Sequence, residues 1–270
     1  MNNAEYHADR TAISKSGLDL IAKSPAHFRY WMDHTRDETP AMQKGTLVHT
    51  MALEPENIKD QYAVMPSEIK QRRGKAYEAF AAEAGDRVIL TLSQMEEAGR
   101  IVDAVERNPV ERKIIADAEK IEESVFAEDF GTGVMCKCRP DIRIGNRLYD
   151  LKTTRNANAR SFAYSVRSYR YHVQAAFYLD VCRWSGIDVD QFGFIAVDSD
   201  TMPYQCTVYE SLEQSAIDSG REEYRQNLNV YAECLEKNDW PGYPEKYEYL
   251  SLSGDAFNDE YTEDEIGCAV

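Results

Sequence analysis

The chain has 270 residues, of which 43% are hydrophobic and 29% charged, and its net charge is −16. This length suits one globular α/β domain with additions, or two small domains, with room for a substantial core. The acidic balance argues against a nonspecific coat on nucleic acid. The sequence holds no apolar run of about 18 residues and no basic-then-apolar leader, so we expect no membrane segment.

The six cysteines show neither Cys-x-x-Cys pairs nor histidines at zinc spacing. Cys136 and Cys138 lie two residues apart, which would put both on one face of a strand. We therefore expect reduced core thiols and a cytoplasmic protein.

The amino-terminal part, residues 10–118, is predicted to be mainly helical. Ser16 and Asp19 fit a capping box at a first helix, and Pro25 fits the first position of a second. A third helix is expected over Lys44–Leu53, where His49 follows Gly45 by one turn and glycine would permit a close approach.

The next segments are a possible basic loop and a clear helix. Gln71–Lys75 is either a flexible basic loop or the solvated face of a helix. Thr91–Arg107 is amphipathic and predicts a helix, with Ser93 and Glu96 as its capping box. Pro109 would open another short helix.

Residues 119–210 are predicted to form the sheet core. After it we expect a carboxy-terminal helix within 211–238 and an acidic tail over 243–270, the whole forming one domain over 1–242. The order of elements predicts a mixed sheet flanked by helices. The strands are expected at 121–128, 134–138, 192–197 and 204–209, with a long helix over 155–183.

Chemistry-bearing side chains gather on a hairpin that ends the run Cys136–Lys152. Gly145-Asn146 suits a two-residue type II′ turn, which makes Asp141 face Asp150. Lys152 then shares a face with Asp150, because strand side chains alternate. Two facing carboxylates repel each other, and a divalent cation between them would relieve this. The alternative is an ordinary solvated hairpin.

Positive charge is concentrated around these two acids. Residues 136–172 hold nine Lys and Arg against Asp141 and Asp150, so the remainder of the chain carries −23. This distribution would steer a phosphate-rich substrate to the hairpin.

The chain resembles the PD-(D/E)xK nuclease superfamily, and more narrowly the RecE-like (exonuclease VIII) phage exonucleases. The motif itself is Pro140-Asp141 followed by Asp150-Leu-Lys152. The blocks that carry the resemblance are Glu5-Tyr-His7, Ile13-Ser-Lys-Ser16, Gly45-Thr-Leu-Val-His49, Glu123-Ser124, Cys136–Asp141, Asp150–Thr154, Tyr169–Gln174 with Ala176–Tyr178, and Asn238–Pro241.

The resemblance implies a PD-(D/E)xK fold and a metal-dependent phosphodiesterase. Its metal would be Mg²⁺, with Mn²⁺ as the alternative, held by His49, Asp141, Asp150 and the backbone carbonyl of Leu151. Mg²⁺ prefers such oxygen ligands and can activate water and stabilise the leaving oxygen. Lys152 would act as a base or as an electrostatic stabiliser.

The resemblance implies further roles, and each of these residues also has a purely structural interpretation. Glu123, Gln174 and Tyr178 would orient ligands or water, or they are solvated and core-edge residues. Ser14 and Ser16 would contact a terminal phosphate, or they simply cap a helix. The expected contacts to backbone phosphates are Arg155, Arg160 and Arg170.

The resemblance implies a 5′→3′ double-strand exonuclease that leaves 3′ overhangs for recombination by single-strand annealing. Expected partners are duplex DNA ends, a RecT-like annealing protein and further copies in a ring-like trimer or tetramer, inside a bacterial or phage-infected cell. Two alternatives stay open: a structure-specific endonuclease and a catalytically silent DNA-end-binding module.

Overall fold

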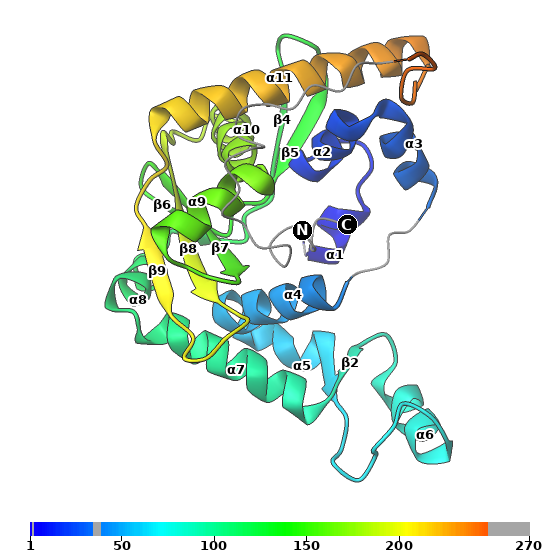
Figure 1. Cartoon of the computed structure of the whole chain (residues 1–270), viewed down its shortest axis with the longest axis vertical. Coiled ribbons are helices and arrows are strands. Elements are labelled where there is room, and N and C mark those ends of the chain that lie inside the picture. The colour runs from blue at the N-terminus through cyan, green and yellow to red at the C-terminus, as the bar shows by residue number, and fades with distance from the viewer. Residues whose placement is uncertain (2, 35–38, 248–270) are drawn as a thin grey trace.

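A five-stranded mixed sheet forms the centre of the computed structural model, which describes residues 1, 3–34 and 39–247 (Figure 1). The strand order is β3-β6-β7-β8-β9, with β7 and β8 parallel and the other neighbours antiparallel. The strands are β3 (Lys120–Ile121), β6 (Ile142–Ile144), β7 (Arg147–Thr154), β8 (Gln191–Asp198) and β9 (Cys206–Tyr209). The predicted mixed sheet flanked by helices is confirmed.

Each face of this sheet carries its own hydrophobic core. One face packs against α4 (Pro40–Leu53) and α7 (Leu92–Arg107) through Tyr149 and Leu151. The other face packs against α10 (Tyr171–Trp184) and α11 (Gln214–Lys237) through Leu148. Because strand side chains alternate, Asp150 and Lys152 lie on the α10 side with Leu148.

The amino-terminal helices lie beside α11 and a second, two-stranded sheet (Figure 1). These helices are α1 (Asn3–Ala8), α2 (Lys15–Lys23) and α3 (Pro25–Asp33), and the small sheet pairs β4 (Val125–Glu128) with β5 (Met135–Cys138). Ile13 joins β5 by a parallel bridge to Cys136. The thiols of Cys136 and Cys138 are free and buried, as expected.

A projecting arm leaves the body after α4 (Figure 1). It runs through η1 (Pro55–Asn57), α5 (Ile58–Gln61), β1 (Tyr62–Val64), α6 (Lys75–Ala84) and β2 (Val88–Leu90), with β1 and β2 parallel. The remaining helices are α8 (Pro109–Ala116) and α9 (Ala159–Ser168). No helix in the described part of the chain is long and apolar enough to span a membrane.

The hairpin register follows the sequence prediction. Ile144 pairs with Arg147 across β6 and β7, and Gly145 has φ +56°, as the first central position of a type II′ turn requires.

Both predicted helix caps were wrong by two residues. Ser14, not Ser16, caps α2 by accepting from the Gly17 N–H. Thr91, not Ser93, caps α7, in a capping box with Gln94. Each helix therefore begins two residues, about half a turn, earlier than its Ser-x-x-acid pattern indicated.

Two long elements are broken where the backbone turns left-handed. The helix predicted over 155–183 divides into α9 and α10 at Arg170, which has φ +55°. The strand predicted over 121–128 divides into β3 and β4, which belong to different sheets, and Glu122 between them has φ +54°. Most of the predicted acidic tail lies outside the described residues.

Candidate active site

Asp150, Lys152 and Gln174 form one connected group on the α10 face of the sheet. Lys152 Nζ lies 2.6 Å from Asp150 Oδ2. From α10, the Gln174 side-chain amide donates to Asp150 Oδ1. Asp150 is buried, being 2% exposed, so both of its oxygens depend on protein partners.

Asp141 and His49 form a second group that adjoins the first. The His49 Nε2 lies 2.9 Å from Asp141 Oδ2, and the Leu151 N–H donates to the same oxygen at 2.7 Å. Since Leu151 stands between Asp150 and Lys152, this bond fixes Asp141 against the strand that carries both. The structure thus brings the predicted His49, Asp141, Asp150, Lys152 and Leu151 together.

Because α4 packs closely on β7, His49 lies beside Asp141. A Cβ at Gly45 would lie 3.3 Å from Thr153 Oγ1, tighter than ordinary van der Waals contact. Gly45 therefore lets the helix approach the end of β7, and His49 follows one turn later.

Glu122 is a site carboxylate that the sequence analysis missed. Its Oε1 lies 3.2 Å from His49 Nδ1, and Arg139 Nε donates to its Oε2 at 2.6 Å. Glu123, which was singled out instead, pairs with Arg143 at 3.1 Å. The left-handed backbone at Glu122 accompanies the placement of Glu122, rather than Glu123, beside His49. The local sequence does not distinguish these two adjacent acids.

The buried charges shift one another's proton affinity. Burial and the neighbouring Asp141 raise the pKa of Asp150 to about 6, against the opposing effect of Lys152. Burial and Asp141 likewise raise the pKa of Glu122 to about 7. Burial alone lowers the pKa of His49, but Asp141 and Glu122 outweigh it and raise that pKa to about 9.

Lys152 keeps its proton in this setting. Burial lowers its pKa, but Asp150, Tyr171 and Asp141 together raise it above the ordinary lysine value. The Nζ also lies 4.6 Å from the centroid of the Tyr171 ring, a cation–π contact.

The residues present fit a divalent cation. One ligand atom from each of His49, Glu122 and Asp141 lies within 4.8 Å of the others. Glu122 Oε1 and Asp150 Oδ2 are buried, and each lies against a cationic group, His49 Nδ1 at 3.2 Å and Lys152 Nζ at 2.6 Å. A divalent cation could supply the positive charge that these two carboxylate oxygens now receive from side chains.

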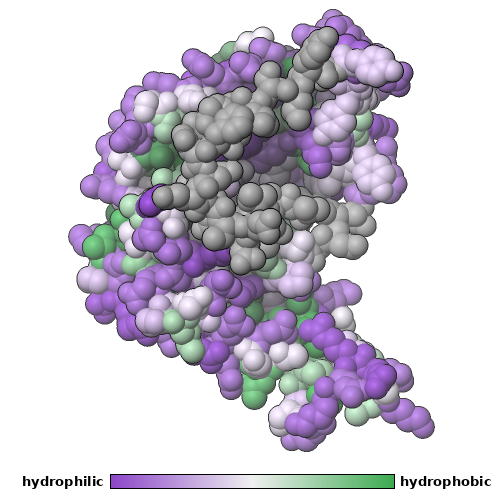
Figure 2. Space-filling view, viewed as in Figure 1, coloured by the Kyte–Doolittle hydropathy of each residue, from purple (hydrophilic) through white to green (hydrophobic). Residues whose placement is uncertain are grey.

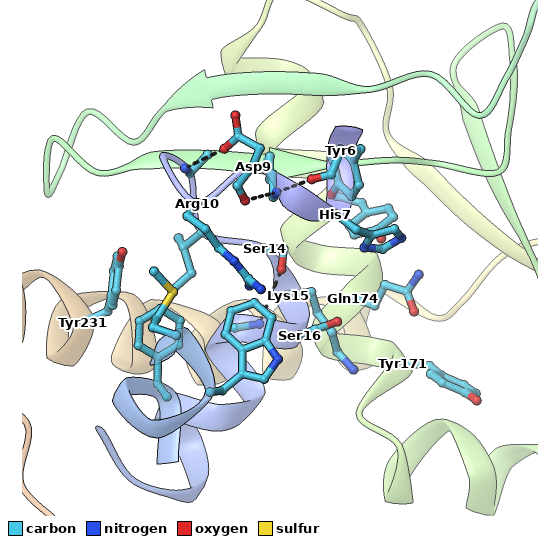
Figure 3. Close-up of a pocket in the computed structure, with 18 of the residues that line it drawn as sticks. Tyr6, His7, Asp9, Arg10, Ser14, Lys15, Ser16, Tyr171, Gln174 and Tyr231 are labelled. Carbon is cyan, nitrogen blue, oxygen red and sulfur yellow. Dashed lines mark hydrogen bonds between the residues drawn. The ribbon is translucent and has the colours of Figure 1, made fainter. Parts of the chain in front are cut away.

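A cavity of about 320 Å³ adjoins this cluster (Figure 3). Lys152, Gln174, Tyr171 and Tyr178 line it from the sheet and α10, and the start of α2 lines it from across. The lining residues from that start are Ser14, Lys15, Ser16 and Gly17.

Cations surround the cavity. Lys137 is 4% exposed, and its Nζ donates to the carbonyls of Tyr6 and Asp9. Arg10 lies 3.8 Å over the Trp31 ring, and Lys15 Nζ lies 2.7 Å from Asp19. The cavity therefore offers hydroxyls, a helix start and ammonium groups to an anion.

The three predicted arginines do not join this group. Arg155 lies in the loop after β7 and Arg160 on α9, both exposed and outside the cavity lining. Arg170 is held by Glu223 at 3.2 Å and by Asp19 at 3.5 Å, so a phosphate would compete with two carboxylates for it.

The mixed sheet that carries Asp150 and Lys152, with Asp141 held against β7 by the Leu151 N–H, has the fold of the PD-(D/E)xK nucleases, as the resemblance implied. Residues 14–253 match the family described as "PDDEXK-like domain of unknown function (DUF3799)", and the chain belongs to that family. Among curated proteins there is no match.

The chain is similar to several solved structures. The chain is similar to a putative exonuclease from Eubacterium rectale, at 13% identity over 97% of this chain and 99% of the other, with a TM-score of 0.65. It is also similar to an alkaline exonuclease from Laribacter hongkongensis, at 16% identity over 87% and 97% of the two chains and a TM-score of 0.37. A phage-related exonuclease from Haemophilus somnus is similar at 13% identity over 87% and 100%, with a TM-score of 0.35.

Proposed function

We propose that this protein is a metal-dependent exonuclease that degrades double-stranded DNA from its ends, 5′→3′, leaving 3′ single-stranded overhangs. The observation that carries the proposal is the close grouping of Asp141, Asp150 and Lys152 at β7, with His49 beside them. Membership of a PD-(D/E)xK-type family supports the same chemistry.

His49, Asp141, Asp150 and Glu122 would hold the metal, with the Leu151 carbonyl as a further ligand. Bound Mg²⁺, or Mn²⁺, would activate water and stabilise the leaving oxygen. Gln174 orients Asp150 by donating to it. In the metal-free protein its acidic neighbours raise the pKa of Lys152, which supports an ammonium that places the attacking water and offsets charge on the phosphate. Tyr178, at the cavity wall, and Glu123, through its neighbour Glu122, have supporting roles.

The cavity beside Lys152 would receive the phosphate at the DNA end. Ser14 and Ser16 present hydroxyls there, at the start of the nine-residue helix α2. A helix start favours anions, and Lys15 and Lys137 add positive charge. An end-binding pocket next to the hydrolytic group supports exonuclease rather than internal cleavage.

The wider assignment rests on the family resemblance. We propose action together with a RecT-like annealing protein, in a ring-like trimer or tetramer around the duplex, in the cytoplasm of a bacterial or phage-infected cell. Arg155 and Arg160 are proposed contacts to backbone phosphates.

End-labelled linear duplex tests the proposal. With Mg²⁺, we expect a 5′ label to appear first as mononucleotide, while a 3′ label stays on long single strands. Covalently closed circles should remain intact. Cleaved circles would favour the structure-specific endonuclease, and tight end-binding without hydrolysis would favour the silent binding module.

A further inference from the structure

The projecting arm carries four neighbouring cations that have no acidic partner. Residues 69–77 contain Lys70, Arg72, Arg73 and Lys75 and no Asp or Glu, while the exposed Glu68 and Glu78 flank them. All four are exposed, and none of them forms an ion pair with another described residue. In a chain of net charge −16, these four cations form a locally positive segment.

The two arginines are held by neutral groups instead. Arg72 Nη2 donates to the Ile89 carbonyl of β2 at 2.8 Å, and Arg73 Nε donates to Gln71 Oε1 at 2.6 Å. These bonds position the guanidinium groups without cancelling their charge, so their remaining donors face solvent.

The start of α6 adds a second anion-attracting feature at the same point. Its N-cap is Gly74, with φ +87° and no side-chain cap, so the first N–H groups of this ten-residue helix lack the usual oxygen acceptor. A Cβ at Gly74 would meet nothing within 4 Å, so the helix begins at an open part of the surface. Uncapped N–H groups and four cations together suit phosphate oxygens.

The base of the arm is tied to the helix that carries His49. Tyr62 of β1 and Leu90 of β2 are buried in one core with Leu47 and Val48 of α4. From this base the arm extends outward as a hydrophilic projection (Figures 1 and 2). It is therefore fixed relative to the candidate active site while its tip stays exposed.

We propose that this arm, residues 66–75 with the start of α6, binds the phosphate backbone of the duplex that extends beyond the active site. The inference rests on the proposed function, because it takes duplex DNA as the substrate. The cations here are not part of the hydrolytic group, so the arm would affect affinity and processivity rather than the chemical step.

Binding without divalent metal tests the arm separately from hydrolysis. In the combined variant Lys70→Gln, Arg72→Gln, Arg73→Gln and Lys75→Gln, we expect duplex affinity to fall at least about tenfold at low salt. The slope of log affinity against log salt should become shallower by about 3 to 4, since each lost phosphate contact removes about 0.9. The matched control removes four exposed cations of α7, α8 and β3 that likewise form no ion pair with another described residue: Arg100→Gln, Arg107→Gln, Arg112→Gln and Lys120→Gln.

A single substitution separates binding from folding. Ala76→Glu puts an acid in the first turn of α6, where it favours the helix dipole but repels phosphate. We expect an equal or higher melting temperature and roughly three- to tenfold weaker duplex binding.

Equal affinity and salt slope in wild type and arm variant, or equal losses in arm variant and control, would overturn the proposal. Failure of the proposed function gives a different pattern. Wild-type protein would then bind duplex through the arm yet release no nucleotide when Mg²⁺ is added.

Discussion

At the scale of single residues, the site holds three carboxyl groups close together in the protein interior, an arrangement that destabilises the metal-free protein. Asp141, Asp150 and Glu122 are buried close together, and the pKa values of Asp150 and Glu122 are raised to about 6 and about 7 as a result. His49 and Lys152 supply the compensating positive charge in the metal-free protein. A bound divalent cation would take over that compensation and compete with the proton on His49.

His49 should stabilise the metal-free protein in a defined pH range. Its folded pKa of about 9 exceeds the ordinary value of 6.5, so its contribution is complete below pH 6.5 and disappears as the pH rises through about 9. With chelator present, His49→Gln should lower the unfolding free energy by roughly 1–3 kcal/mol at pH 6.5 and by almost nothing at pH 10.

Chemical denaturation at the two pH values measures this difference. Exposed His34→Gln provides the control, because His34 forms no ion pair with another described residue. A His49→Gln deficit that is equal at pH 6.5 and pH 10 would contradict the ion-pair geometry.

The sequence predicted these site residues unevenly. Asp141, Asp150 and Lys152 could be grouped because strand alternation and a two-residue turn are local rules, and the structure follows them. Glu122 could not be chosen over Glu123, because the left-handed backbone at Glu122 depends on β3 and β4 joining different sheets. Likewise, the contact of Arg170 with Asp19 and Glu223 links segments far apart in the chain.

At the scale of elements, the packing of α10 against α11 positions Gln174 in the candidate active site. Helix α10 brings Gln174 to Asp150, and α11 packs across the start of α10. At that crossing, a Cβ on Gly220 would lie 2.3 Å from the His172 carbonyl oxygen, a distance that backbone atoms cannot accommodate without moving. Gly220 therefore fixes how closely α11 approaches the helix that holds Gln174.

Gly220→Ala should destabilise the protein. Separating α10 from α11 to admit the methyl group is expected to cost roughly 1–3 kcal/mol, measured by chemical denaturation, and to reduce nuclease activity by displacing Gln174. The matched control is Gly99→Ala within α7, where the nearest atom, Met51 Cε, is 3.9 Å from the new Cβ. There the substitution should stabilise by about 0.5–1 kcal/mol.

Equal effects of the two glycine substitutions would show that α10 and α11 are not in the close contact described. The pair thus separates helix propensity, which favours alanine at both positions, from packing, which forbids it at one.

Element boundaries show where local patterns mislead. Ser16 and Ser93 each begin a Ser-x-x-acid pattern, yet the caps are Ser14 and Thr91. Several polar residues can cap a helix start, and burial of the apolar face decides among them. In α2 that face is Leu18 and Ile21, packed in the core below Ile13. Such packing is a tertiary property that a short pattern does not contain.

At the scale of the whole molecule, charge is divided by location. The chain is strongly acidic overall, but cations line the cavity beside Lys152 and cover the tip of the arm. An acidic surface with two positive regions would hold duplex DNA in one path and repel it elsewhere. The sequence placed Lys137 and Lys152 in a positive segment and left 71–75 open between a basic loop and a helix face; Arg10 and Lys15 join the cavity only through the tertiary fold.

Digestion of linear duplex with and without divalent metal tests most directly whether the Asp150–Lys152 group performs hydrolysis. We expect wild-type protein to release nucleotides with Mg²⁺ and none with chelator. Asp150→Asn and Lys152→Met should each lower the rate by about 10²-fold or more while duplex binding through the arm persists. Wild-type protein inert on linear duplex with both Mg²⁺ and Mn²⁺, or variants as fast as wild type, would contradict the proposed function.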